Sequence, residues 1–391
     1  MTTPDMNTFE QRLVEALHQE ASLAMTLTDT PRELRRWRDG QRHRRNRARV
    51  AAIVGIAAAV AGLIIGLTML GSKTSGRPEP AHKPSAVAPH RATIQTLQPL
   101  PASLSATVLH GPGTVDVVAF GAVWGMDTTD QPRYLYRMSA DGGRILGRTD
   151  LHNYIGDPVP SFRIGSVLMV PSVNGPGHDG YVVIDRNGKR AGFTPASKAG
   201  AGAGDASGGW VQTDIDQVAQ VDGSGHLTGR RVRLPSASVS AVAAGAGSLW
   251  VGTTSGGMYR LDPATGRITG RFVAPGQPIQ IAAIDSAVYV ATNGYQLLRL
   301  DPSTLHVTAV NDNQVSPASW DEIALGPNGS LWVAPDQRGV AELDPVTLAV
   351  TRSVQISKAS REGGNFGIGL QGGRMFIGDG DNHRVVSFPL K

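Results

Sequence analysis

Carboxylates, amides and aromatic residues stand just before several apolar, strand-like segments in the C-terminal three quarters of the chain. Two carboxylates beside an aromatic side chain could bind a cation or a basic ligand, or act as an acid and a base if burial raised one pKa. The most concentrated groups are Trp320-Asp321-Glu322 and Arg361-Glu362. The candidate ligand-binding residues are Asp116, Ser161 with Arg163, Asp205, Ser240, Gln280, Trp320, Asp321, Glu322, Arg361, Asn365 and Phe366. The alternative for each is a solvated loop residue.

Recognisable catalytic motifs are absent from the sequence. It has no Gly-x-Ser-x-Gly elbow, no His-Glu-x-x-His pair and no phosphate-binding Gly-Lys-Ser/Thr loop. The ten histidines do not cluster at metal-ligand spacings, and the absence of cysteine excludes thiolate catalysis. Asp379, Asp381 and Asn382 offer oxygens for Ca2+, but the EF-hand spacing is missing and a capped turn is expected. We therefore predict no metal site and no cofactor, with Ca2+ or Mg2+ as the alternative.

A unit of about forty residues repeats along this part of the chain. Residues 247–270, GSLWVGTTSGGMYRLDPATGRITG, return as residues 328–351, NGSLWVAPDQRGVAELDPVTLAVT. Asp262 and Pro263 favour a type I turn, and Gly266 tolerates the left-handed conformation that closes the hairpin. Together with the apolar segment 239–244, the unit has four short strands, which is the content of one propeller blade.

The bulky residue in the second strand recurs seven times, at Trp124, Met169, Trp210, Trp250, Tyr289, Trp332 and Phe376. This spacing predicts an all-β fold, a seven-bladed β-propeller, over residues 93–391. The seventh unit ends after its third strand, so residues 91–100 are expected to supply the fourth and close the ring. In a propeller, the residues that lead into the innermost strands crowd one mouth of the central channel. The candidate residues are therefore expected to meet there.

The first 92 residues divide into three segments, which predict a short cytoplasmic helix and one transmembrane helix ahead of the propeller. Residues 1–49 contain an amphipathic pattern over residues 8–24 and nine arginines in residues 32–49. Residues 50–71 carry no charge and, as a helix, would span roughly 33 Å, enough to cross a bilayer. Residues 72–92 read as a Pro-rich linker. The arginine excess places residues 1–49 in the cytoplasm and the propeller outside the cell membrane.

The repeated units resemble the YVTN and NHL type of seven-bladed propeller, the group of YncE-like and streptogramin lyase-like proteins. The segment GDGDNHRVVSF, residues 378–388, is similar to the Asn-His-Arg segment of NHL repeats. The layout of the chain also resembles that of actinobacterial envelope proteins. The resemblance implies a binding protein, a sensor or an enzyme. For lactonase-like members it implies a Glu, Asn, Asn and Asp set, to which Glu322, Asn365, Asp116 and Asp205 are a loose match.

The sequence as a whole predicts a membrane-anchored extracytoplasmic propeller that acts as a binding, scaffold or sensor domain. The alternative is a metal-dependent lyase or lactonase-like enzyme. The expected partners are the membrane and an envelope protein, polymer or small ligand, with a cytoplasmic partner for residues 9–24. The basic block is a topology signal in this interpretation, so no nucleic acid is expected.

Overall fold

The computed structural model describes most of the C-terminal three quarters of the chain. The described residues are 88–94, 106–110, 112–127, 134–141, 143–151, 161–173, 179–235, 238–294, 296–313, 322–326, 329–336, 339–356 and 367–390. The helix expected at residues 8–24 and the spanning segment expected at residues 50–71 lie outside them. Within the described ranges, no helix is long and apolar enough to cross a membrane.

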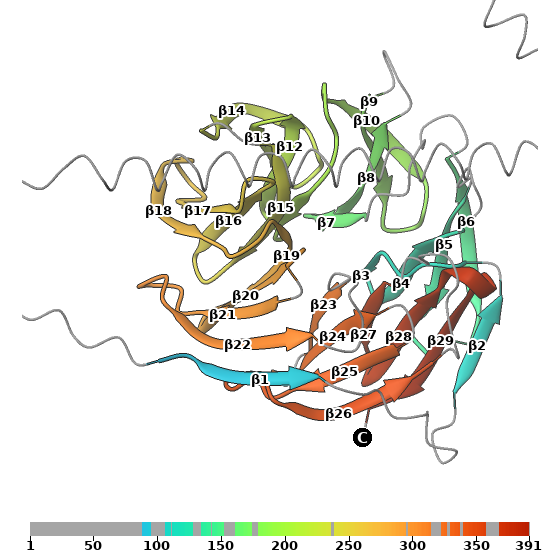
Figure 1. The fold of residues 1–391 in the computed structure, drawn as a ribbon. Helices are drawn as coiled ribbons and strands as arrows, with labels where there is room; N and C mark the ends of the chain where they lie inside the picture. Colours follow the sequence, from blue (N-terminus) through green and yellow to red (C-terminus); the bar gives the residue numbers. More distant parts are fainter. Residues whose placement is uncertain are drawn as a thin grey trace, which may run out of the picture. The chain divides into compact units, whose positions relative to one another are not determined.

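The described strands form seven sheets arranged as blades around a central channel (Figure 1), so the prediction of an all-β seven-bladed propeller is confirmed. In each blade the consecutive strands pair antiparallel, from the innermost strand outward. Blade 1 contains β3 (Val117–Ala119), β4 (Ala122–Met126), β5 (Tyr134–Ser139) and β6 (Ile145–Asp150), and blade 2 contains β7 (Phe162–Ile164), β8 (Val167–Val173), β9 (Asp179–Asp185) and β10 (Arg190–Pro195). Blade 3 contains β11 (Gly202–Gly204), β12 (Gly208–Asp214), β13 (Gln217–Asp222) and β14 (Leu227–Arg233). Blade 4 contains β15 (Val239–Gly245), β16 (Ser248–Thr253), β17 (Gly257–Leu261) and β18 (Ile268–Val273). Blade 5 contains β19 (Pro278–Ile284), β20 (Ala287–Thr292), β21 (Gln296–Leu300) and β22 (Val307–Asn313). Blade 6 contains β23 (Glu322–Leu325), β24 (Leu331–Asp336), β25 (Gly339–Leu343) and β26 (Val350–Gln355). Blade 7 contains β27 (Ile368–Gln371), β28 (Arg374–Asp379) and β29 (Arg384–Pro389).

The recurring bulky residue lies in the second strand of every blade and is buried in all seven cases. Each of these side chains packs toward the following blade. The Trp124 ring, for example, lies beside Gly188 in the turn between the third and fourth strands of blade 2. Trp210 likewise lies beside Gly266 of blade 4, whose φ is +74°. The repeat period thus reflects the contact between successive blades.

Ring closure differs from the prediction that residues 91–100 supply the missing strand. β2 (Thr107–His110) pairs antiparallel with β29 and completes blade 7. Leu109 of β2 packs against the core cluster that contains Phe376 and Val385. Residues 112–116 then connect β2 directly to the first strand of blade 1, so the closing strand is the segment immediately before the first blade.

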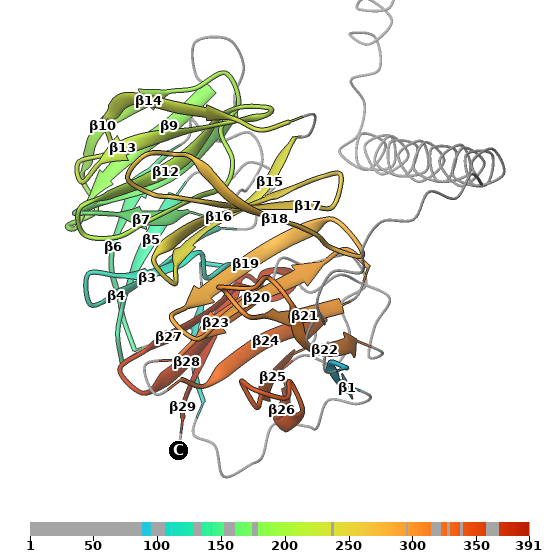
Figure 2. The same cartoon turned by 90° about the vertical axis from the view of Figure 1, so that its left-hand side faces the viewer.

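The segment that was expected to close the ring joins another blade. β1 (His90–Ile94) pairs in parallel with β22 and becomes a fifth, outermost strand of blade 5 (Figure 2). β1 starts inside the segment 72–92 that composition identifies as a linker. Parallel pairing at a blade edge has no local signal in the sequence, because it joins residues more than 200 positions apart.

Candidate functional site

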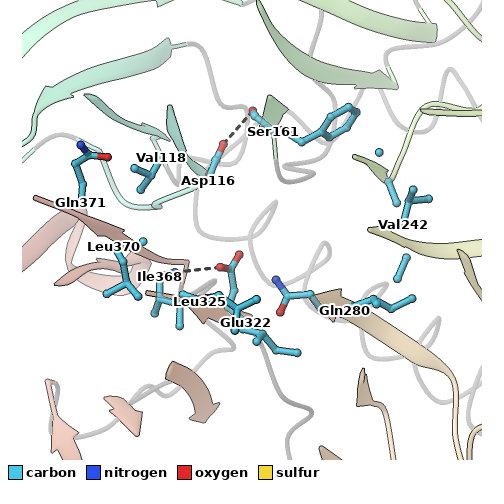
Figure 3. A pocket seen from close by; sticks show the side chains of 18 of the residues that line it. Asp116, Val118, Ser161, Val242, Gln280, Glu322, Leu325, Ile368, Leu370 and Gln371 are labelled. Carbon is cyan, nitrogen blue, oxygen red and sulfur yellow. Dashed lines mark hydrogen bonds between the residues drawn. The ribbon is translucent and has the colours of Figure 1, made fainter. Parts of the chain in front are cut away.

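The innermost strands of all seven blades line a central channel of about 820 Å3. Its wall is about as polar as it is apolar, and its apolar lining residues include Val118, Val242, Ile279, Ile323 and Leu370. Polar groups are concentrated where the innermost strands begin (Figure 3). We call this end the acidic mouth and define it by Asp116, Ser161, Gln280 and Glu322. The residues leading into these strands therefore do converge, as the propeller prediction requires.

Asp116 precedes β3 and connects blades 1 and 2. Its Oδ1 accepts a hydrogen bond from Thr114 Oγ1 over 2.6 Å, and its Oδ2 accepts one from Ser161 Oγ over 3.3 Å. Burial raises the pKa of Asp116 from its ordinary 3.8 to about 6, although these hydrogen bonds lower it in part. Because the residue is half-buried in the channel wall, its carboxyl group can exchange a proton near neutral pH.

Glu322 begins β23 in blade 6 and reaches blade 7. Its Oε2 accepts a hydrogen bond from the backbone N–H of Ile368 over 3.2 Å. Blade 7 lies between blades 6 and 1 in the closed ring, so Glu322 and Asp116 stand on either side of its innermost strand. The two carboxyl groups therefore border the same stretch of the acidic mouth, as Figure 3 shows.

Gln280 of blade 5 adds an amide to the acidic mouth on the other side of Glu322 (Figure 3). Its Oε1 is buried and has no hydrogen-bond partner among the described residues. Next to it, Ser240 Oγ donates to the carbonyl of Pro278 over 2.6 Å and so connects blades 4 and 5. Blades 1, 5 and 6 each present a hydrogen-bond acceptor at this mouth.

Two candidate residues do not belong to the acidic mouth, which corrects the sequence prediction. Asp205 follows the innermost strand of blade 3 instead of preceding it. There it caps a turn, accepting from the backbone N–H and hydroxyl of Ser207 at 2.7 Å each, and these bonds lower its pKa. Arg163 is exposed, donates to the carbonyl of Gly165 and stacks over the Phe120 ring at 5.0 Å. It does not line the channel, whereas its neighbour Phe162 does.

Five further candidates, Trp320, Asp321, Arg361, Asn365 and Phe366, lie outside the described residues. The loose match to a lactonase-like set loses Asp205, because Asp205 is at the other end of its strand. Within the described residues, no three histidine or carboxylate side chains are grouped so that they could hold a metal ion. The capped turn expected at Asp379 is not formed: the Asp379 carboxylate makes no capping bond to the backbone and accepts hydrogen bonds from the side chains of Asn382 and Arg384.

Sequence reasoning missed one residue that lines the channel and one that supports a lining residue. Thr114, two positions before Asp116, holds the carboxylate with its hydroxyl. Arg374 lines the opposite end of the channel, where Nη2 donates to the backbone carbonyl and the hydroxyl of Ser387. Thr114 could have been found from its position ahead of a strand. Arg374 could not, because it follows the innermost strand and lies outside the group of residues that lead into these strands.

Known proteins resemble this chain in fold alone. No family model matches the sequence, and no curated protein is similar to it. Among solved structures, a chain of the mitotic checkpoint complex aligns with a TM-score of 0.58 and 14% identity, covering 82% of this chain and 98% of its own. The Pan2 WD40 domain of Neurospora crassa gives 0.55 and 11%, covering 75% and 97%. BamB from Moraxella catarrhalis gives 0.50 and 14%, covering 74% and 98%. The YVTN and NHL assignment stays a prediction.

Proposed function

We propose that this chain is a membrane-anchored binding protein whose extracytoplasmic propeller takes a cationic ligand at the acidic mouth of its channel. The observation that carries the proposal is the position of Asp116 and Glu322, two carboxylates from blades 1 and 6 that border one cavity. The one basic side chain among the described lining residues, Arg374, belongs to the opposite end of the channel. A protonated amine or a divalent cation would therefore meet acceptors there without a competing cation.

Ligand binding can be measured as a shift in the thermal unfolding midpoint of the full chain in detergent, with spermidine, Ca2+ or Mg2+ as probes. A probe present at about 100 times its dissociation constant adds roughly 2.7 kcal/mol to the free energy of unfolding. We expect Asp116→Asn and Glu322→Gln to reduce the shift. Asp205→Asn is the matched control, because Asp205 caps an exposed turn away from the acidic mouth. Equal shifts in all four proteins would refute binding at this mouth.

The anchored topology rests on the charge-free residues 50–71 and the nine arginines before them. Since the chain has no cysteine, single cysteines introduced at Thr8 and at the exposed Ser224 can be labelled one at a time in intact cells. A membrane-impermeant maleimide should label the cysteine at position 224 and not the one at position 8. Labelling of both, or of neither, would contradict the proposed orientation.

Acid–base catalysis is a second candidate function, and the raised pKa of Asp116 is the observation that favours it. A carboxyl group that titrates near pH 6 can donate or accept a proton under physiological conditions. If the protein is a lactonase or a lyase, it turns over a lactone or glycan substrate, and Asp116→Asn abolishes this turnover while the protein stays folded. Turnover that persists in the Asp116→Asn protein would show that Asp116 takes no part in the reaction.

A protein partner is the alternative to a small ligand or an envelope polymer. One structural neighbour is a chain of the mitotic checkpoint complex and so belongs to a protein assembly, which supports this alternative. A sensor would also need a cytoplasmic partner for residues 9–24. Deleting residues 1–31 should then abolish a cellular phenotype while the propeller stays displayed. A deletion that leaves the phenotype unchanged would contradict the sensor hypothesis.

A further inference from the structure

The outer edges of the blades are protected from pairing with other strands, with one exception. The outermost strands of blades 1, 2, 3, 4 and 6 each carry at least one arginine, namely Arg148 in β6, Arg190 in β10, Arg230, Arg231 and Arg233 in β14, Arg271 in β18 and Arg352 in β26. In blade 7 the outermost strand, β2, is only four residues long. Charged side chains and short strands are the usual means of blocking an exposed edge. β22 has seven residues and carries one charged residue, Asp312, but neither lysine nor arginine, so its edge is less protected than the others.

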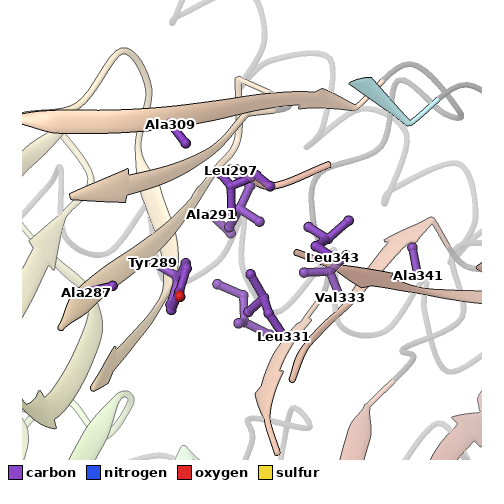
Figure 4. Packing of buried hydrophobic residues seen from close by; sticks show 11 residues of the cluster. Ala287, Tyr289, Ala291, Leu297, Ala309, Leu331, Val333, Ala341 and Leu343 are labelled. Carbon is purple, nitrogen blue, oxygen red and sulfur yellow. The ribbon is translucent and has the colours of Figure 1, made fainter. Parts of the chain in front are cut away.

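β22 is buried on both faces like an interior strand. Ala309 is completely buried in the core cluster between blades 5 and 6 (Figure 4). Asn311 is also buried, and its Nδ2 donates to the carbonyl of Leu348 in blade 6 over 2.7 Å. Val310, on the other face, packs in the cluster that contains Trp250 of blade 4. What remains open on β22 is its backbone edge, and β1 covers that edge.

β1 is held on this edge mainly by its backbone. The side chains of His90, Arg91 and Thr93 are exposed, and Ala92 is half-buried. Arg91 forms an ion pair with Asp312 at 3.6 Å, but the two side chains are 71% and 33% exposed. Solvent-exposed ion pairs add little stability, and none of these four side chains is fully buried, so together they contribute little to holding β1 on the edge. The described side chains of β1 therefore hold it weakly on the β22 edge, and its backbone pairing does most of the holding.

The connection to the rest of the propeller allows β1 to leave. Residues 95–106, twelve in number, join the end of β1 to the start of β2. A chain of this length can extend by about 40 Å. The same sequence can thus reach the β22 edge of its own propeller or that of a neighbouring copy.

We propose that β22 is a docking edge between copies of this chain, on which the His90–Ile94 strand of a second copy replaces the resident β1. The sequence known to fit the edge is that of β1 itself, whose Arg91 side chain forms an ion pair with Asp312, and every copy supplies it. Exchange of an identical element is a low-cost route to a dimer. The inference does not depend on the channel ligand, although anchoring in one membrane would raise the local concentration of copies and favour the exchange.

Disulfide trapping tests the exchange directly, because the natural chain contains no cysteine. Thr93 stands opposite Asp312 in the register of β1 and β22. Two full-length chains with different tags, one carrying Thr93→Cys and the other Asp312→Cys, are co-expressed in the membrane and oxidised. The control pair combines Thr93→Cys with Thr269→Cys, which places the second cysteine on the exposed outermost strand of blade 4.

We expect a disulfide-linked product carrying both tags, at least about fivefold more abundant than in the control pair, and its loss when Ala92→Pro disables β1. A third chain with both Thr93→Cys and Asp312→Cys reports pairing within one molecule. If this chain crosslinks only internally and the mixed pair gives no more product than the control, the strand stays with its own propeller and the proposal is overturned. Absence of any crosslink, internal or mixed, would also overturn it, since β1 would then not occupy the β22 edge.

Discussion

Arg260 in the third strand of blade 4 donates a hydrogen bond through Nη1 to the carbonyl oxygen of Pro302, over 2.7 Å. Pro302 lies in the turn between the third and fourth strands of blade 5. Arg299 of blade 5 repeats the contact with Pro345 of blade 6, through Nε over 3.1 Å. The aspartate of each Asp-Pro turn caps its own turn, while the proline carbonyl accepts from the preceding blade. The repeated Asp-Pro pair is therefore a connector between blades as well as a turn signal.

Arg260→Ala is expected to lower the free energy of unfolding by about 1–2 kcal/mol, because it leaves the carbonyls of Pro302 and Ser303 without their charged donor. Urea unfolding followed by tryptophan fluorescence measures the change. Arg230→Ala is the control, since Arg230 is exposed on β14, and it should change stability by less than about 0.5 kcal/mol. Equal effects of the two substitutions would show that the contact with Pro302 contributes nothing.

Gly266→Ala tests the packing of each turn against the preceding blade. A Cβ at Gly266 would lie 2.6 Å from Val232 Cγ2 and 3.0 Å from the Trp210 ring, at a φ of +74°. We expect a loss of about 1–3 kcal/mol in the free energy of unfolding. Gly147→Ala, where a Cβ meets nothing within 4 Å, is the matched control and should be nearly neutral. A tolerated Gly266→Ala would mean that the turn can shift away from Trp210.

Leu109→Asp tests which N-terminal strand closes the ring. Leu109 packs on the cluster around Phe376 and Val385, so a carboxylate there should cost about 2–4 kcal/mol and open blade 7. Thr93→Asp, on the exposed surface of β1, should leave the unfolding midpoint almost unchanged. If Thr93→Asp destabilised the protein and Leu109→Asp did not, residues 91–100 would be the segment that closes the ring.

The sequence predicted those features that depend on residues close together in the chain. The bulky residue of the second strand recurs roughly every forty residues in all seven blades, and Asp-Pro turns recur in blades 4 to 6, where the left-handed position is Gly266, Leu305 and Leu348. Their repetition was sufficient to predict seven blades. The aspartates cap their turns through bonds to residues two or three positions away, as Asp301 does with Ser303 and Thr304. Such contacts need no knowledge of the rest of the fold.

Features that depend on long-range pairing could not be predicted in this way. β2 and residues 91–100 are both short strand-like segments, and only their contacts with distant blades distinguish them. The innermost strand of blade 3 consists of Gly202, Ala203 and Gly204, which have no apolar pattern to mark its ends. From the sequence alone, Asp205 is therefore expected before this strand, whereas in the structure Asp205 follows the strand. Arg163 was misplaced because a strand of three residues turns only one or two side chains into the channel.

Stability should depend on pH through Asp116. Its pKa is about 6 in the folded protein and near 3.8 when unfolded, so between these values the folded state holds a proton that the unfolded state lacks. The stabilisation is complete below about pH 4 and is lost as the pH rises through 6, a change of about 3 kcal/mol. Asp116→Asn should remove this dependence and stabilise the protein at pH 7.5. A stability difference between the two proteins that grows toward low pH would contradict the assigned pKa.

The most direct test of the account is the affinity of the full chain for spermidine at pH 7.5 and pH 5, measured by isothermal titration calorimetry with wild type, Asp116→Asn and the Asp205→Asn control. We predict that wild type and the control bind at pH 7.5 and lose at least about fivefold in affinity at pH 5, where Asp116 is protonated. Asp116→Asn should bind weakly at both pH values. Wild-type affinity that is independent of pH and unaffected by Asp116→Asn would contradict a cation site at the acidic mouth.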